Sequence, residues 1–167
     1  MRGSRRVPSL VTYAVGTSVL GRLLVATSDR GVCAVSLGDL DEPLERELRR
    51  DFPRARLARD DQALAPTLAA VAAHLAGGAT PSGPVDLDGT PFQRRVWAAL
   101  LAVPRGETRS YAEVAASIGL PATAARAVAR ACAQNRVALL VPCHRVVRGS
   151  GDLSGYRWGV ERKARLA

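Results

Sequence analysis

The chain has 167 residues, of which 47% are hydrophobic, and its 24 Lys and Arg against 15 Asp and Glu give a formal net charge of +9. This length suffices for one sizeable core or two small ones, and the hydrophobic content argues against a disordered chain. Three cysteines are too few for a disulfide framework, and no apolar run is long enough to span a bilayer. Without a convincing secretory segment, we expect a cytoplasmic protein that does not enter a membrane. The basic side chains are almost all arginine, which suits bidentate phosphate contacts and permits a polyanionic partner.

The first half of the chain has the pattern of a small domain that mixes strands and helices. We expect a basic tail over residues 1–8, an α/β domain over 9–80 and a Pro/Gly/Asp-rich linker over 81–89. Three β-rich runs precede two helical runs, and Asp41 is a candidate cap for the first helix. The expected strands span 10–15, 21–26 and 31–37, and the expected helices span 42–50 and 60–76.

The region from residue 90 to residue 167 has a helical pattern. A first helix is expected with Thr90 as its cap and Pro91 as its first residue, since threonine accepts a backbone N–H and proline lacks one. Two more helices are expected over 111–118, capped by Ser110, and over 123–134. Two short helices around a glycine-containing turn suggest a helix-turn-helix, a motif whose second helix enters a groove of DNA.

The last of these helices is rich in alanine, at positions 124, 125, 127, 129 and 131. Small side chains allow two helices to pack closely. They equally suit a helix that lies in a groove too narrow for larger side chains. The residues alone leave both interpretations open.

A cysteine and a histidine stand side by side at Cys143 and His144, after an apolar run over 137–141 that predicts a buried strand ending at Pro142. A thiol attacks only as the thiolate, and a free cysteine has a pKa of about 8.5, so nearby positive charge must favour ionisation. His144 and Arg145 can supply that charge, and His144 can also accept the proton. A Cys-His pair alone is weak evidence, because a free cysteine is more often a small residue of the core.

The surroundings of this pair carry a family resemblance. Pro142-Cys143-His144-Arg145-Val146 resembles the signature of the O6-alkylguanine-DNA alkyltransferases. Gly155-Tyr156-Arg157-Trp158-Gly159 looks most like the methyltransferase domain of the Ada-type bacterial proteins. The matching motifs run in order through the second half of the chain: Gly89-Thr90-Pro91-Phe92-Gln93, Val96-Trp97, Pro104-Arg105-Gly106-Glu107-Thr108, Ser110-Tyr111, Arg126-Ala127-Val128, Asn135 and Gly155-Tyr156-Arg157-Trp158-Gly159.

The resemblance implies an α+β protein with a ribonuclease-H-like sheet-plus-helix domain, followed by a helical domain that contains the helix-turn-helix. It implies a DNA repair protein that flips O6-alkylguanine out of duplex DNA and transfers the alkyl group irreversibly to its own cysteine. This activity is that of a methylated-DNA–protein-cysteine S-methyltransferase, a stoichiometric enzyme. The expected partner is double-stranded DNA bound through its minor groove, the expected state is a monomer, and no cofactor is required. With only Cys33 and His74 as candidate ligands before residue 90, we expect no structural zinc.

The resemblance also assigns roles to individual residues. Cys143 would be the nucleophile and His144 its base, Asn135 would brace the cysteine turn, and Tyr111 would donate a hydrogen bond to the departing guanine. The residues implied in DNA binding are Thr123, Ala125, Arg126, Ala127 and Arg145, with Arg126 inserting into the duplex. The residues implied in the substrate pocket are Val146, Tyr156, Arg157, Trp158 and Lys163.

Two further hypotheses remain open at this point. The family has a glutamate a few residues beyond the lysine, completing a relay, and this chain ends at Ala167 before that position. An alternative is therefore a sensor that binds alkylated DNA without repairing it, although the presence of Cys143 argues against this class. A cysteine hydrolase would also use a Cys-His pair, but it would turn over many times.

Overall fold

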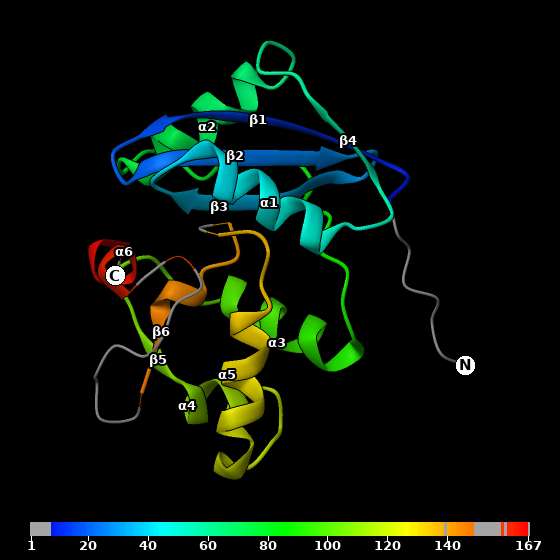
Figure 1. Ribbon diagram of the computed structural model, residues 1–167. Coiled ribbons are helices and arrows are strands. Elements are labelled where there is room, and N and C mark those ends of the chain that lie inside the picture. The colour runs from blue at the N-terminus through cyan, green and yellow to red at the C-terminus, as the bar shows by residue number, and fades with distance from the viewer. Residues whose placement is uncertain (1–7, 139, 149–157, 159, 167) are drawn as a thin grey trace. The chain divides into compact units, whose positions relative to one another are not determined.

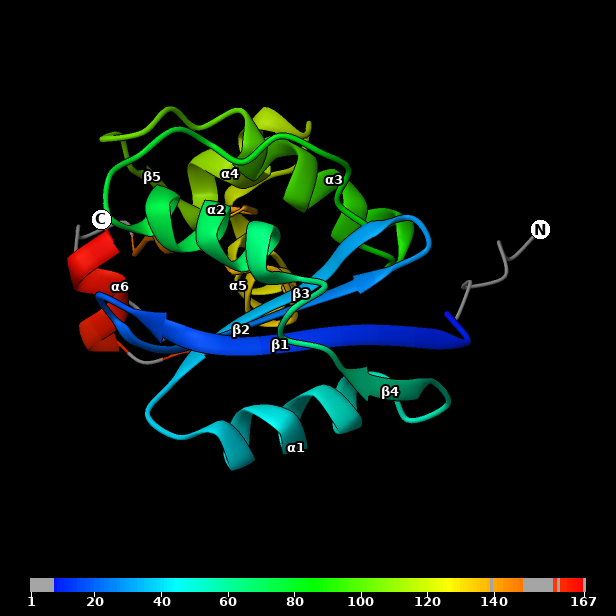
Figure 2. The same ribbon diagram turned by 90° about the horizontal axis from the view of Figure 1, so that it is seen from above.

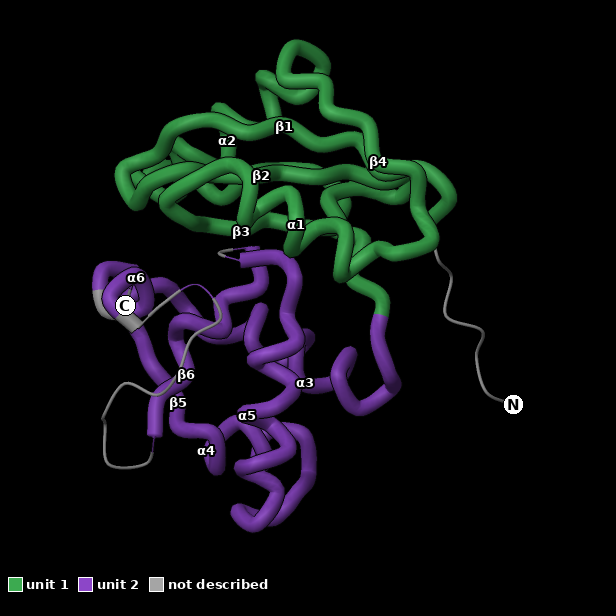
Figure 3. The backbone as a smooth tube through the Cα atoms, viewed as in Figure 1, with its two compact units in different colours: residues 1–88 green, residues 89–167 purple. Residues whose placement is uncertain are grey.

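The computed structural model describes residues 8–138, 140–148, 158 and 160–166 (Figure 1). The chain divides into two compact units, residues 1–88 and residues 89–167 (Figure 3). The first unit combines a mixed sheet with helices and the second is mainly helical, so the α+β class expected from the sequence is confirmed. Among the described residues, none of the helices has the length and apolar character needed to cross a membrane.

The first unit is built on a four-stranded sheet in the order β3-β2-β1-β4. Strands β1 (Leu10–Ser18), β2 (Gly21–Ser28) and β3 (Gly31–Gly38) form an antiparallel meander, and β4 (Arg56–Arg59) adds in parallel to β1. Helices α1 (Asp41–Asp51) and α2 (Ala65–Leu75) cover opposite faces of this sheet (Figure 2).

Alternation along β1 explains why both faces can be covered. Val11, Tyr13 and Val15 belong to one core cluster with Leu44 and Leu48 of α1. The intervening positions point to the other face, because successive side chains of a strand alternate. A Cβ built at Gly16 would meet the Leu68 side chain of α2 at 2.5 Å, so glycine allows this helix to approach the sheet.

The stretch expected to be a linker packs in part on the first unit. Val32 donates its N–H to the Pro84 carbonyl at 3.0 Å, and the Asp86 N–H donates to the Val32 carbonyl at 2.7 Å. Gly31 permits this approach, because a Cβ there would lie 2.2 Å from the Pro84 oxygen and the backbone has a φ of +136°. The contacts fix residues 84–86 against the edge of β3.

Three sequence-based expectations for this unit need correction. Strand β4 was not expected, since four residues with arginine at both ends carry no strand signal; it forms because it pairs with β1. The second helix begins at Ala65 rather than at residue 60, because the Asp60 side chain accepts the Ala63 N–H at 3.0 Å and makes a turn there. Asp41 is the first residue of α1 rather than its cap, and its carboxylate accepts from Arg22 at 2.6 Å.

The second unit begins with helix α3 (Pro91–Leu101), which has a complete capping box: the Thr90 side chain accepts the Gln93 N–H, and the Gln93 side chain accepts the Thr90 N–H. A second capping box, from Ser110 and Glu113, starts α4 (Tyr111–Ser117). Both caps expected from the sequence are confirmed, and each places a helix start at a defined residue.

Helices α4 and α5 (Ala125–Ala133) form the helix-turn-helix, joined through a turn and the short 3-10 helix η1 (Ala122–Ala124). The third expected helix thus starts as a 3-10 turn and becomes α-helical only at Ala125. Helix α3 holds the pair in place, since the Trp97 Nε1–H donates to the Ala131 carbonyl of α5 at 2.9 Å in the buried interior.

The rest of the second unit is short elements. The 3-10 helix η2 (Cys143–Arg145) leads into strand β6 (Val146–Val147), which pairs in parallel with β5 (Arg109–Ser110). Helix α6 (Val160–Leu166) follows. The two-residue ladder matters for the site, because β5 runs directly into α4 while η2 runs directly into β6.

Candidate active site

The segment before the Cys-His pair is a series of tight turns, so the strand predicted over residues 137–141 is wrong. The Val141 N–H donates to the Val137 carbonyl at 3.2 Å, and the Cys143 N–H donates to the Val141 carbonyl at 2.8 Å. Val137, Ala138 and Val141 are buried, as expected, and the backbone groups named here bond locally or to one side chain.

That side chain is Asn135, which is fully buried just beyond the end of α5. Its Nδ2 donates to the Val141 carbonyl at 2.9 Å and to the Cys143 Sγ at 3.3 Å, and its Oδ1 accepts the Val137 N–H at 2.9 Å. One amide therefore satisfies two buried backbone groups and reaches the thiol. A donor aimed at sulfur favours the thiolate over the thiol, because it stabilises the charged form.

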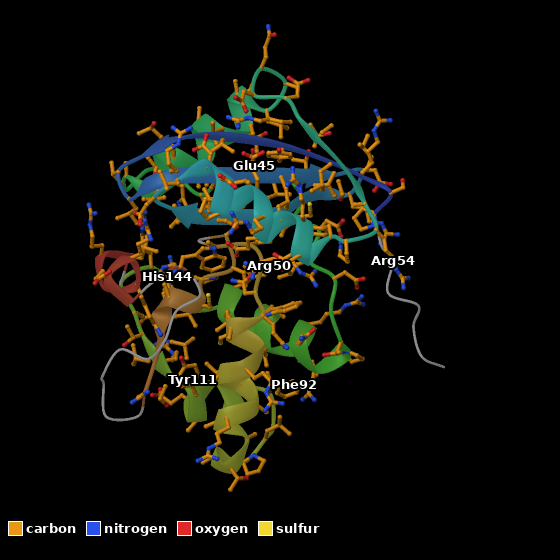
Figure 4. The ribbon with its side chains drawn as sticks, in the orientation of Figure 1. Glu45, Arg50, Arg54, Phe92, Tyr111 and His144 are labelled. Carbon is orange, nitrogen blue, oxygen red and sulfur yellow. The ribbon has the colours of Figure 1, made fainter. Side chains whose placement is uncertain are left out.

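Cys143 and His144 occupy the first two positions of η2, and each is only 4% exposed. Figure 4 labels His144 on this turn and Tyr111 at the start of α4. The second unit therefore holds a buried thiol, a neighbouring imidazole and an amide donor on the sulfur. Such an arrangement can carry out nucleophilic chemistry at sulfur.

Lys163 of α6, the lysine of the chain, is also buried, with 1% of its surface exposed. Its Nζ lies 5.8 Å from the centroid of the Tyr111 ring, a cation–π geometry. Burial lowers the pKa of the Lys163 ammonium, and the Cys143 and Cys132 thiols nearby oppose that shift. The Lys163 ammonium therefore lies close to both the Tyr111 ring and the Cys143 thiol.

A second buried thiol, Cys132 of α5, was not singled out by the sequence analysis. Burial raises its pKa to about 12, and the neighbouring Cys143 adds to the rise while Lys163 opposes it. At neutral pH Cys132 therefore stays protonated and unreactive. No local signal in the sequence shows that Cys132 is protected, because its burial arises from the fold.

Arg145 and Val146 complete the turn. The Arg145 Nη1 donates to the Val103 carbonyl at 2.8 Å, just beyond the end of α3. Burial, with a smaller contribution from Arg105, lowers the pKa of the Arg145 guanidinium. Val146 is fully buried where β6 pairs with Arg109.

The remaining pocket residues from the sequence analysis are placed only in part. Trp158 is buried. Tyr156 and Arg157 lie outside the described residues. Within the residues that are described, no three side chains of His, Cys, Asp or Glu gather in a way that could hold a metal ion.

The outward surface of the helix-turn-helix is basic and has small side chains. Val128, Ala131 and Cys132 of α5 face the interior. Thr123, Arg126, Ala127 and Arg130 are exposed, while Ala125 is half-buried. The exposed residues recur three and four positions apart, so they share one face of the helix.

The net charge of the chain resides entirely in the second unit. Residues 89–167 hold 13 Lys and Arg against 4 Asp and Glu, a net +9, whereas residues 1–88 hold 11 of each. The unit with the buried thiol is thus also the unit that attracts polyanions. Fold and site together define a protein of two compact units that combines a buried cysteine–histidine pair with a basic helix-turn-helix.

Comparison with known proteins identifies the family. Residues 11–88 match the family model described as "6-O-methylguanine DNA methyltransferase, ribonuclease-like domain", and residues 91–167 match "6-O-methylguanine DNA methyltransferase, DNA binding domain". The methylated-DNA–protein-cysteine methyltransferase of Mycolicibacterium paratuberculosis is 39% identical over 158 residues, which cover 94% of this chain and 90% of that protein. The chain belongs to the 6-O-methylguanine DNA methyltransferase family.

Other relatives agree with this assignment. The Escherichia coli protein named "Bifunctional transcriptional activator/DNA repair enzyme Ada" is 52% identical over 157 residues, which cover 93% of this chain and 44% of that protein. The chain thus spans less than half the length of that relative. Among solved structures, Mycobacterium tuberculosis O6-methylguanine methyltransferase has 37% identity and a TM-score of 0.77, covering 94% of this chain and 90% of its own. The crystal structure of Mycobacterium tuberculosis OGT in complex with DNA has 38% identity and a TM-score of 0.78, covering 93% of this chain and 89% of its own.

Proposed function

We propose that this chain is a methylated-DNA–protein-cysteine methyltransferase that moves the methyl group of O6-methylguanine in duplex DNA onto its own Cys143. The observation that carries the proposal is the Asn135 Nδ2 donor 3.3 Å from the Cys143 Sγ, in the unit that holds the whole net charge. Membership of the family supports the same reaction. The protein would act as a monomer in the cytoplasm, without a cofactor.

The DNA partner would lie against the exposed face of α5. Thr123, Ala125 and Ala127 offer little bulk, which suits a helix in the narrow minor groove, and Arg126 and Arg130 offer positive charge to the phosphates. The relative solved in complex with DNA supports a nucleic-acid partner for this fold.

The reacting base must leave the duplex, because sulfur cannot reach the methyl carbon inside the stack. Flipping a base costs a few kcal/mol in unstacking, and Arg126 would offset part of that cost by filling the vacated space. The pocket for the base would be formed around Val146, Tyr156, Arg157 and Trp158.

The transfer step exchanges one bond for another. The Cys143 sulfur attacks the methyl carbon, a C–S bond forms, the C–O6 bond breaks, and its electron pair stays on the guanine. His144 would take the thiol proton before attack. Tyr111 would donate a hydrogen bond to the guanine as negative charge develops on it, and the Lys163 ammonium beside the Tyr111 ring would favour that charge. The product thioether has no facile leaving path, so each molecule would react once.

A single-turnover incubation tests this proposal. The protein is mixed with a duplex that carries one O6-methylguanine, and its peptides are analysed by mass spectrometry, with Cys143→Ala as the control. We expect one methyl group on Cys143 at a stoichiometry near one and none on the variant. Tight binding of the duplex without transfer would instead indicate the sensor, and repeated turnover would indicate a hydrolase.

A further inference from the structure

Helix α3 and the residues just after it form hydrogen bonds with two parts of the second unit that the reaction needs, helix α5 and the turn η2. Within the helix, Trp97 donates to the Ala131 carbonyl of α5. Just past its last turn, the Val103 carbonyl accepts the Arg145 Nη1 at 2.8 Å. Arg145 is the last residue of η2, the turn that begins with Cys143. Helix α5, which would bind DNA, and the turn η2, which carries the thiol, are therefore both hydrogen-bonded to α3 or to the residues just after it.

Arg145 is unlike the arginines on the surface of the helix-turn-helix. Arg126 and Arg130 are exposed, whereas Arg145 is half-buried and directs its guanidinium to a backbone carbonyl of its own unit. Val103 is itself buried, so loss of this donor would be costly for its carbonyl. An arginine that binds phosphate keeps its charged head toward solvent, which is the reverse of this arrangement.

The turn is held at three points. The Asn135 amide bonds the Cys143 sulfur, the backbone of Val146 pairs with Arg109, and the Arg145 side chain bonds the Val103 carbonyl. The first of these contacts comes from the Asn135 side chain, and the second comes from strand β5. The third joins the last residue of η2 to the residue two positions past α3, so it adds a restraint that neither of the other two supplies.

We propose that Arg145 is a positioning residue for methyl transfer: its bond to the Val103 carbonyl sets the orientation of the turn that presents the Cys143 sulfur. This role replaces the DNA contact that the sequence suggested for Arg145. The proposal rests on the proposed function, since methyl transfer is the reaction that the orientation serves.

The test separates positioning from DNA binding. Single-turnover rate constants at saturating duplex, and the Kd of the duplex at several salt concentrations, are measured for the wild type, Arg145→Ala and Arg145→Lys. Displacing a reacting atom by about 1 Å can cost roughly a hundredfold in rate, so we expect Arg145→Ala to lower the rate constant at least about tenfold with Kd changed less than about twofold. Arg145→Lys retains one donor and should recover part of the loss.

Two other arginine-to-alanine variants serve as comparisons for Arg145→Ala. Arg46→Ala removes an exposed arginine from the first unit, where its partner is Glu42, and controls for the loss of one positive charge. Arg130→Ala shows the effect of a lost surface charge on α5, a higher Kd. Thermal unfolding confirms that each variant is folded. If Arg145→Ala raises Kd and weakens its salt dependence while the saturating rate stays at the wild-type value, Arg145 is a DNA contact and the proposal is overturned.

A reaction without DNA distinguishes failure of this proposal from failure of the proposed function. Iodoacetamide alkylates thiolates directly, and mass spectrometry resolves Cys143 from the other two cysteines. Because a rotated turn withdraws the sulfur from the Asn135 donor, folded Arg145→Ala should be alkylated at Cys143 more slowly than the wild type. A wild type that transfers no methyl group would refute the proposed function alone, whereas equal alkylation rates in the two proteins would refute the role of Arg145.

Discussion

Replacement of Asn135 by alanine should destabilise the fold and impair the nucleophile together. The change removes the acceptor of the Val137 N–H and one of the two donors to the Val141 carbonyl, which keeps the Cys143 N–H; both groups belong to residues at most 2% exposed. A buried donor left without a partner costs about 1–3 kcal/mol and a lost hydrogen bond about 0.5–1.5 kcal/mol, so we expect a loss of about 1.5–4.5 kcal/mol in the free energy of unfolding. Because a domain of this size has a total of only about 5–15 kcal/mol, the variant would be marginal but measurable.

The assay is urea unfolding followed by circular dichroism, with Arg130→Ala on the exposed face of the preceding helix as the control. The control should lie within about 0.5 kcal/mol of the wild type. Asn135→Asp sharpens the experiment, since it keeps an acceptor for the Val137 N–H but turns an oxygen toward the Cys143 sulfur and the Val141 carbonyl. We expect Asn135→Asp to react with iodoacetamide at Cys143 more slowly than the wild type. A stability loss below about 1 kcal/mol in Asn135→Ala, with methyl transfer retained, would refute the reasoning.

Three other predictions follow from the second unit. Trp97→Phe keeps an aromatic ring but removes the indole N–H that donates to the Ala131 carbonyl. The free energy of unfolding in urea should fall by about 1–3 kcal/mol, and an unchanged midpoint would contradict this. Native Cys132 should resist iodoacetamide at pH 8.5 and react once unfolded in urea. Folding raises the pKa of Cys132 from 9.0 to about 12, so between these values the folded state keeps a proton that the unfolded state loses. The free energy of unfolding should therefore fall as pH rises through this range. Cys132→Ala should make this pH dependence weaker. Arg130→Ala should weaken duplex binding and reduce the slope of log Kd against log salt by about one, and an unchanged slope would exclude a phosphate contact.

The sequence predicted those elements whose signals are local. Thr90 and Ser110 start helices because their side chains accept a backbone N–H three residues on, and that spacing can be read in one dimension. The strands of the meander were also predicted, although they are longer than expected, since pairing extends each strand beyond its most apolar residues. The proximity of Cys143 to His144 needs no fold at all.

The errors occurred where a hydrogen-bond or packing partner outside the local hydrophobic pattern decides the structure. The apolar run before Pro142 has the composition of a strand, but the Asn135 side chain takes the hydrogen bonds that a neighbouring strand would have supplied. Strand β4 exists only through its pairing with β1. Helix α6, which carries Lys163 into the interior, was likewise not predicted. Lys163 and Tyr111 are 52 positions apart along the chain, so the sequence alone did not predict the contact between them.

The ladder between β5 and β6 sets where the chain can change length. Arg109 and Ser110 pair with Val146 and Val147, and the next residue after Ser110 begins α4. One residue inserted between Ser110 and Tyr111 would rotate the start of α4 by about 100° and advance it by about 1.5 Å, carrying the Tyr111 ring away from the Lys163 ammonium. An insertion within residues 104–108 lies before the ladder and would leave the pairing intact. Length variation among functional homologues should therefore accumulate before Arg109 and be absent between Arg109 and Tyr111.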